Sequence, residues 1–162
     1  MDNKIELEDL LLIKVDKNNL KHLEYLKKLF QNKEDKSMDF LGQLDQQIDD
    51  NTFIVQNKHD KKVGYFAMSK PVINYLGLFS ISLYYTIEPT YRSKGYATIL
   101  LQEMSQYLLE KNDMLVLNIH KKNLASRRVA EKAGFQLEFT SDEEEEEIYT
   151  KYAQKQKKIR RW

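Results

Sequence analysis

The sequence predicts a single α/β domain over residues 1–162, and three observations support this prediction. Short apolar runs typical of strands alternate with segments of helical periodicity along most of the chain. The length of 162 residues falls within the range of one domain. Hydrophobic residues make up 41% and charged residues 31%, a balance that suits a folded core beneath a charged surface and argues against disorder.

The first half of the chain predicts a strand, two helices and a hairpin. Strands are assigned to short apolar runs, and helices to segments where apolar residues recur every three or four positions after an Asn or Ser that can cap them. The turn Asn57-Lys58-His59-Asp60 separates two strand-like runs, and Pro71 ends the second. The expected elements are a strand at 10–15, a helix from Asn18 or Asn19 to Phe30, a helix from Ser37 to Ile48, and strands at 52–56 and 62–69.

The second half predicts alternating strands and helices followed by a strand pair. Pro89 closes a long run rich in Ile, Leu, Tyr and Ser that is typical of a central strand. The run at 114–119 is apolar throughout, as expected for a buried parallel strand. The expected elements are a strand at 78–87, an amphipathic helix at 94–111, a strand at 114–119, a helix from Asn123 to Gly134, and antiparallel strands at 135–140 and 148–153.

Composition excludes several classes of protein. There is no cysteine, so disulfides, zinc fingers and thiol nucleophiles are excluded. The three histidines, His22, His59 and His120, are scattered, and we expect no metal site. Lys and Arg total 26 against 25 Asp and Glu, which gives no global attraction to nucleic acid or to an anionic membrane. We see no targeting segment and no apolar run that would span a bilayer, and we expect a cytoplasmic protein.

The segment 87–97, between the central strand and the long helix, has the features of an anion site. A helix N-terminus carries unsatisfied N–H groups and a partial positive charge. Gly95 and Ala97 lack bulk, so a phosphate can approach the backbone, and Arg92 and Lys94 add positive charge. On physical grounds alone, a pyrophosphate cradle and a plain strand-to-helix turn explain the segment equally well. The glycine patterns of the Rossmann and Walker A phosphate motifs are both missing here.

A second motif runs from Asn123 to Phe135 and has the form of an N-cap, a helix and a glycine stop. Taken alone, Ser126 would be only a capping partner. The order and separation of the two motifs change that interpretation. Arg92-x-x-Gly95-x-Ala97 after a strand resembles the acyl-CoA pyrophosphate loop of the GNAT superfamily, and Asn123-x-x-Ser126 followed by Glu131-Lys132-x-Gly134-Phe135 resembles its downstream helix. This pattern of Asn, Ser and Glu-Lys-x-Gly-Phe resembles the branch of the superfamily that includes ribosomal-protein N-terminal acetyltransferases.

The resemblance implies a GNAT fold, with a mixed, mostly antiparallel sheet of six to seven strands flanked by about four helices. It implies an acetyl-CoA-dependent N-acetyltransferase that passes the acetyl group to a primary amine of a small molecule or protein through a tetrahedral intermediate. Pantetheine would lie where the strands at 78–87 and 114–119 splay apart. The cofactor-binding residues it implies are Ile87, Arg92, Ser93, Lys94, Gly95, Tyr96, Ala97, Thr98, Asn123 and Ser126.

The resemblance also suggests catalytic groups, with two departures from the usual pattern. The backbone N–H of Tyr85 or Thr86 would stabilise the oxyanion. A Glu of some relatives is replaced by Ile81, which leaves His120 as a candidate base. Glu88 either acts through water or simply faces solvent, and we favour the second interpretation. The Tyr that protonates the thiolate in many relatives is replaced by Ala130, which draws attention to Ser126.

Two other classes of function remain open at this point. The missing Glu and Tyr would also suit a non-catalytic acyl-CoA-binding module. The basic tail, 155–161, would suit a nucleic-acid-associated protein, although it has no groove-reading motif.

The acidic run 142–147 suggests a cationic acceptor such as a polyamine, an aminoglycoside, a peptide N-terminus or a lysine. A solvated loop that pairs with the basic tail explains the run equally simply. The resemblance also allows a homodimer, and nothing in the sequence suggests a membrane partner.

Overall fold

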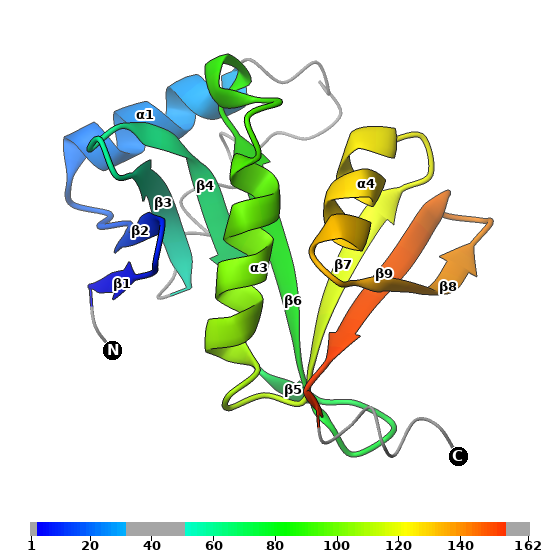
Figure 1. The fold of residues 1–162 in the computed structure, drawn as a ribbon. Helices are drawn as coiled ribbons and strands as arrows, with labels where there is room; N and C mark the ends of the chain where they lie inside the picture. The colour runs from blue at the N-terminus through cyan, green and yellow to red at the C-terminus, as the bar shows by residue number, and fades with distance from the viewer. Residues whose placement is uncertain (1–2, 32–50, 155–162) are drawn as a thin grey trace. The chain divides into compact units, whose positions relative to one another are not determined.

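The computed structural model describes residues 3–31 and 51–154, and the chain forms two compact units. The first unit comprises Met1–Ala67 with Tyr85–Lys94, and the second comprises Met68–Tyr84 with Gly95–Trp162. Strand β6 (Phe79–Ile87) contributes to both units. Figure 1 shows the elements of each. The predicted helix at 37–48 lies outside the described residues.

The first unit is an antiparallel sheet packed against helix α1 (Leu20–Gln31). Apolar residues of α1 at helical spacing, Leu26, Leu29 and Phe30, are buried against side chains of the sheet. The rings of Phe30 and Tyr65 meet edge to face, with centroids 5.2 Å apart. The strands, in hydrogen-bonded order, are β1 (Lys4–Glu6), β2 (Leu10–Lys14), β3 (Thr52–Asn57), β4 (Lys62–Met68) and the end of β6.

Asparagine side chains fix the local structure of this unit. Asn19 Oδ1 accepts the N–H groups of Lys21 and His22 at 3.0 and 3.2 Å, so Asn19 is the cap of α1. Asn57 Oδ1 accepts those of His59 and Lys61 at 2.9 and 3.1 Å and closes the β3–β4 turn. The predicted cap and hairpin are therefore confirmed.

The second unit contains one parallel strand pair in an otherwise antiparallel arrangement. Strand β6 pairs with β7 in parallel, and β7 then pairs with β9 and β9 with β8 in antiparallel fashion. The short strand β5 pairs with β6 at the other side. The elements are β5 (Val72–Ile73), α3 (Tyr96–Leu108), β7 (Met114–His120), α4 (Leu124–Lys132), β8 (Gln136–Ser141) and β9 (Glu146–Tyr152).

The apolar spacing in the second half of the sequence produces the expected burial. Leu100, Leu101 and Met104 of α3 are fully buried, as is Leu115 of β7. Helix α4 ends just before Gly134, whose φ of 90° lies in the left-handed region that favours glycine. The predicted strands and helices of this half are all present, with ends shifted by at most three residues.

The predicted fold class, a mixed and mostly antiparallel α/β arrangement, is confirmed. The described residues form nine strands rather than the six to seven expected. The two additional strands are β1, with three residues, and β5, with two. Both are too short to contain the apolar run from which a strand is predicted.

Candidate active site

The loop after β6 begins with a tight turn that belongs to the first unit. The N–H of Glu88 donates to the carbonyl of Val63 at 2.8 Å, and the 3-10 turn η1 (Pro89–Tyr91) follows. The Nε–H of Arg92 donates to the carbonyl of Ile87 at 3.1 Å. The side chain of Arg92 is thus folded back toward the end of β6, and this hydrogen bond fixes the position of its guanidinium group.

The backbone of this loop adopts two left-handed conformations within three residues. Ser93 has a φ of 62° and Gly95 a φ of 86°. A positive φ is uncommon for a residue with a side chain and is often found at functional sites. Turns that mix left- and right-handed residues aim successive N–H groups into a concavity that binds anions. A Cβ added at Gly95 would meet nothing within 4 Å, so the space over the loop is open.

Helix α3 starts at this glycine without a capping side chain. The first turn of α3 carries no acidic residue to offset the partial positive charge of the helix start. The ammonium group of Lys94 lies 5.5 Å above the ring of Tyr91, and Arg92 through Gly95 are all exposed. Open space, positive charge and unmatched helix donors fit a pyrophosphate group.

The parallel ladder between β6 and β7 is short. It pairs Ser80 with Met114, Ile81 with Leu115 and Ser82 with Val116. Strand β6 runs on to Ile87 and β7 to His120, where β7 remains paired with β9. The parallel ladder therefore covers only the first part of the two strands, which is consistent with the splay that the resemblance implies.

In the first unit, β4 approaches β6 very closely at the residues expected to face the acyl group. A Cβ added at Gly64 would lie 2.2 Å from the carbonyl oxygen of Thr86, so no larger residue fits there. This contact fixes the backbone beside Tyr85 and Ile87. Our sequence analysis did not select Gly64, although a glycine inside a strand-like run signals such a close approach.

Helix α4 starts in the predicted manner. Asn123 Oδ1 accepts the N–H of Ser126 at 3.1 Å, which confirms Asn123 as the cap. Ser126 is half-buried in the first turn, and Ala130 is fully buried. The position that carries Tyr in many relatives is therefore part of the packed core in this chain.

His120 ends β7 with both ring nitrogens engaged inside the second unit. Nδ1 accepts the N–H of Lys122 at 3.2 Å, so the neutral ring carries its proton on Nε2. Nε2 lies 3.4 Å from a carboxylate oxygen of Glu145. His120 stays a predicted base, but its Nδ1 lone pair already accepts the N–H of Lys122.

Comparisons with known proteins identify the family. The model of the acetyltransferase (GNAT) domain matches residues 7–136. The chain belongs to the GNAT acetyltransferase family. It is therefore an acetyl-CoA-dependent acetyltransferase, with acetyl-CoA as the acyl donor. Both the predicted family and the predicted class of enzyme are confirmed, whereas no curated protein matches the chain in sequence.

Solved structures show the same fold at low sequence identity. An acetyltransferase of the GNAT family from Bacillus anthracis has a TM-score of 0.68 and 19% identity, over 93% of this chain and 98% of that one. A mutant spermidine N-acetyltransferase from Vibrio cholerae has a TM-score of 0.70 and 21% identity, over 90% and 95%. The ribosomal L7/L12 α-N-protein acetyltransferase RimL, solved with coenzyme A, has a TM-score of 0.72 and 15% identity, over 91% and 98%.

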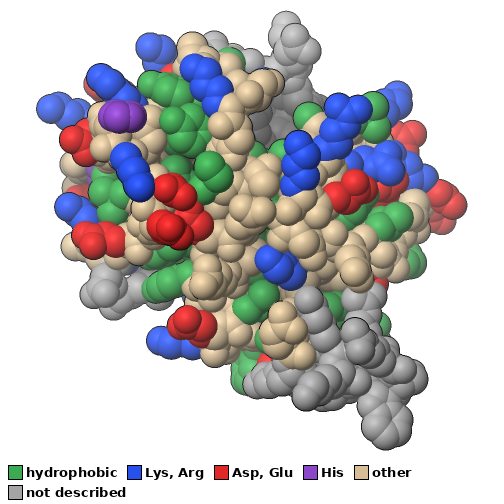
Figure 2. All heavy atoms as spheres, in the orientation of Figure 1, with side chains coloured by type: hydrophobic (Ala, Val, Ile, Leu, Met, Phe, Trp, Pro, Cys, Tyr) green, Lys and Arg blue, Asp and Glu red, His purple; other side chains and the backbone are tan. Residues whose placement is uncertain are grey.

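The acidic run of this GNAT chain is partly neutralised by neighbours in the second unit. Lys121 Nζ lies 2.6 Å from Asp142, and hydrogen bonding to Lys121 lowers the pKa of that carboxyl. Glu145 faces His120, and Glu147 is buried. On the face shown in Figure 2, acidic and basic side chains are interspersed over α4 and the β8–β9 hairpin. The basic tail, the alternative partner of the run, lies outside the described residues.

A hydroxyl that our sequence analysis missed faces the loop from α1. Tyr25 Oη is buried and has no hydrogen-bond partner among the described residues. Burial, followed by the negative charge of Glu88, raises the pKa of Tyr25. The phenol is thus held protonated beside Glu88. The helical spacing of Tyr25 gave no signal that distinguished it from a core residue.

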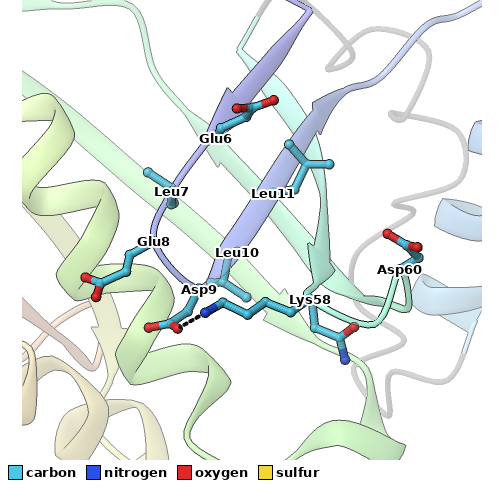
Figure 3. Close-up of a pocket in the computed structure, with 9 residues that line it drawn as sticks. Glu6, Leu7, Glu8, Asp9, Leu10, Leu11, Lys58 and Asp60 are labelled. Atoms are coloured by element: carbon cyan, nitrogen blue, oxygen red, sulfur yellow. Dashed lines mark ion pairs between the residues drawn. The ribbon is translucent and has the colours of Figure 1, made fainter.

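A cavity of about 260 Å³ in the first unit contains none of the predicted site residues. It lies between the β1–β2 and β3–β4 turns, and Figure 3 shows the acidic side chains Glu6, Glu8 and Asp60 around it. Lys58 pairs there with Asp9 at 3.1 Å. Within residues 3–31 and 51–154, no cluster of three or more His, Cys, Asp or Glu is placed to hold a metal ion. None of the helices described is long and apolar enough to cross a membrane.

Proposed function

We propose that this enzyme acetylates a primary amine of a small molecule or protein. The family supplies the acyl donor, and the structural relatives described above are named for a polyamine and for a protein N-terminus. The observation that carries the proposal is the uncapped start of α3 with the left-handed pair Ser93 and Gly95 before it. We assign the pyrophosphate of acetyl-CoA to this loop and helix start, residues 92–98.

In the proposed reaction, the neutral amine attacks the thioester carbonyl directly. An amine of the lysine type has a pKa of about 10.4, so it must lose a proton before attack. The carbonyl oxygen becomes an oxyanion that the N–H of Tyr85 or Thr86 stabilises. Collapse of the tetrahedral intermediate expels the thiolate, which receives a hydrogen bond or a proton from Ser126 or from a water that Ser126 holds.

Removal of the amine proton is assigned to His120 or to a water held by Glu88. His120 accepts a proton at Nδ1 only after it releases the N–H of Lys122. Glu88 is half-buried, so its carboxylate acts from the end of β6 through solvent. The two assignments predict different pH profiles after replacement of either side chain.

We further propose that the acceptor is cationic and that Glu143 and Glu144 attract it. These two carboxylates are exposed at the tip of the β8–β9 hairpin, whereas Asp142 pairs with Lys121 and Glu145 lies against the ring of His120. Exposed charges of one sign raise the local concentration of the opposite charge, and salt weakens the effect. A homodimer, a single-domain organisation and a cytoplasmic location remain predictions.

An acceptor panel tests this function. Release of free thiol from acetyl-CoA is measured with polyamines, aminoglycosides, amino acids, peptide N-termini and peptide lysines. The variant Glu143→Gln/Glu144→Gln should raise KM for cationic acceptors roughly tenfold at low salt and much less at high salt. The control Glu110→Gln/Glu131→Gln removes two other exposed carboxylates. Equal changes for cationic and neutral acceptors would exclude a role for the hairpin tip.

A further inference from the structure

Apolar burial does little to hold helix α4 in place. Among its nine residues, Leu124–Lys132, only Ala130 is buried. A helix shorter than about 12 residues is marginal by itself in water. The orientation of α4 must therefore depend on the polar side chains that connect it to the sheet.

Three such side chains form a closed triangle near the start of α4. The Nε of Arg127 lies 3.1 Å from Glu147 Oε2 and 3.3 Å from Tyr149 Oη. The hydroxyl of Tyr149 donates to the same oxygen of Glu147 at 3.1 Å. Tyr149 is 1% exposed and Glu147 8% exposed, so the phenol and the carboxylate are shielded from water, whereas the Arg127 side chain is 32% exposed.

A second anchor holds the other end of the helix. Lys151 Nζ donates to the carbonyl of Ala133, the C-cap of α4, at 2.8 Å. Residues 147, 149 and 151 alternate along β9, so their side chains leave the same face of the strand. Strand β9 thus holds α4 at both ends, over the face seen in Figure 1.

Stability alone does not account for a buried charge in this place. Replacing a buried ion pair by apolar residues of similar size is often neutral or stabilising. Directional hydrogen bonds, in contrast, permit one arrangement of the groups that they join. Because Arg127 belongs to α4, the helix cannot rotate about its axis without breaking the triangle. Ser126 directly precedes Arg127, so such a rotation would also displace Ser126.

We propose that Arg127, Glu147 and Tyr149 are positioning residues that set the rotation of α4 and so place Ser126 for acetyl transfer. The inference rests on the proposed function, because only that function gives Ser126 a role in turnover. Misplacement of a reacting group by about 1 Å can cost on the order of 10²-fold in rate.

Matched variants separate positioning from stability. Arg127→Met leaves the carboxylate of Glu147 buried without its cation, so it should lower both the midpoint of thermal unfolding and kcat. Arg127→Met/Glu147→Leu removes both charges and should recover most of the stability. We expect kcat to stay about ten- to hundredfold low in the double variant, with the Kd for acetyl-CoA nearly unchanged. Glu147→Gln keeps an acceptor in place and should retain more activity than Glu147→Leu.

Lys151→Met is the control, because it removes the anchor at the far end of the same helix. It should lower stability without the specific loss of kcat. If kcat follows the unfolding midpoint across all variants, or if Lys151→Met lowers kcat as much as the double variant does, the three residues have only a structural role.

Amide hydrogen exchange provides a measurement that needs no acceptor. The double variant should lose protection at 126–128, whereas Lys151→Met should lose it at 132–134. Unchanged protection at 126–128 would overturn the inference. Lost protection at 126–128 in a protein whose wild type releases no thiol with any acceptor would instead reject the proposed function, and the triangle would then only fix the orientation of α4.

Discussion

The two helices of the second unit begin in opposite ways. Helix α4 begins at Asn123, whose side chain accepts the N–H of Ser126, whereas α3 begins at Gly95, which has no side chain to do so. Every helix start presents the same unsatisfied N–H groups and the same partial positive charge. The difference is that a side chain of α4 satisfies one of its donors, whereas no side chain caps the start of α3, which is where we propose that the pyrophosphate binds.

The residues around each start reinforce this difference. The approach to α3 contains Arg92 and Lys94, both exposed, and two left-handed residues in an open loop. Basic side chains before a helix start add to its positive potential rather than offset it, which suits an anionic ligand more than it suits the helix. The α4 start has one cap and is held to the sheet by Arg127. These features support our assignment of the phosphate to the α3 start and of a positioning role to the α4 start.

The largest expected effect comes from closing the α3 start. Gly95→Glu places a side chain and a negative charge in the open space of the loop, and we expect it to abolish acetyl-CoA binding, measured by calorimetry. Gly77→Glu is the matched control, because Gly77 also has a positive φ and nothing within 4 Å of an added Cβ. Both variants carry the same backbone strain and the same charge. Unchanged affinity in a folded Gly95→Glu protein would reject the phosphate assignment.

The contrast between the two helix starts could be predicted only in part from the sequence. Asn123 was identified as a cap, and Gly95 as a residue without bulk near a helix start, because residue type and helical periodicity act locally. The left-handed conformation of Ser93 was not predictable, because a serine carries no requirement for it. The neutralisation of Asp142 by Lys121 was also missed, since it joins segments that only the sheet brings together.

The same distinction applies to the fold. Long apolar runs such as β7 were predicted almost to the residue, because most of their side chains are buried wholly or in part. The two-residue strand β5 was missed, because its residues are exposed and only its pairing with β6 defines it. The triangle of Arg127, Glu147 and Tyr149 was missed for a third reason. Glu147 belongs to an acidic run that looks solvated until the register of β9 turns it inward.

The next effect concerns turnover at the α4 start. Ser126→Ala should lower kcat on the order of 10²-fold, near the low end for general acid assistance, while the Kd for acetyl-CoA changes little. Steady-state kinetics give kcat, and calorimetry on the same preparation gives the Kd for acetyl-CoA. Equal kinetics in variant and wild type would exclude a role for the Ser126 hydroxyl in expulsion of the thiolate.

A smaller effect is expected at the approach to α3. Arg92→Met should weaken acetyl-CoA binding about tenfold, since a hydrogen bond to a charged group contributes about 1.5 kcal/mol. The loss should shrink as salt is raised, because salt screens exposed charges. Lys111→Met is the control, since it removes an exposed positive charge beyond the other end of α3. A loss of equal size in both variants would indicate a general effect of net charge rather than a contact at the loop.

The smallest effect is expected from removing the cap of α4. Asn123→Ala should lower the free energy of unfolding by about 1 kcal/mol, the usual contribution of an N-cap side chain. The variant makes the two helix starts alike in one respect, since neither then has a capping side chain. If capping alone distinguished them, Asn123→Ala would create a second phosphate site, and inorganic phosphate would stabilise the variant more than the wild type in thermal unfolding. We expect no such gain, because α4 lacks the left-handed loop that precedes α3. Phosphate-dependent stabilisation of Asn123→Ala would show that the missing cap by itself, and not the conformation of residues 93–95, makes a helix start in this chain an anion site.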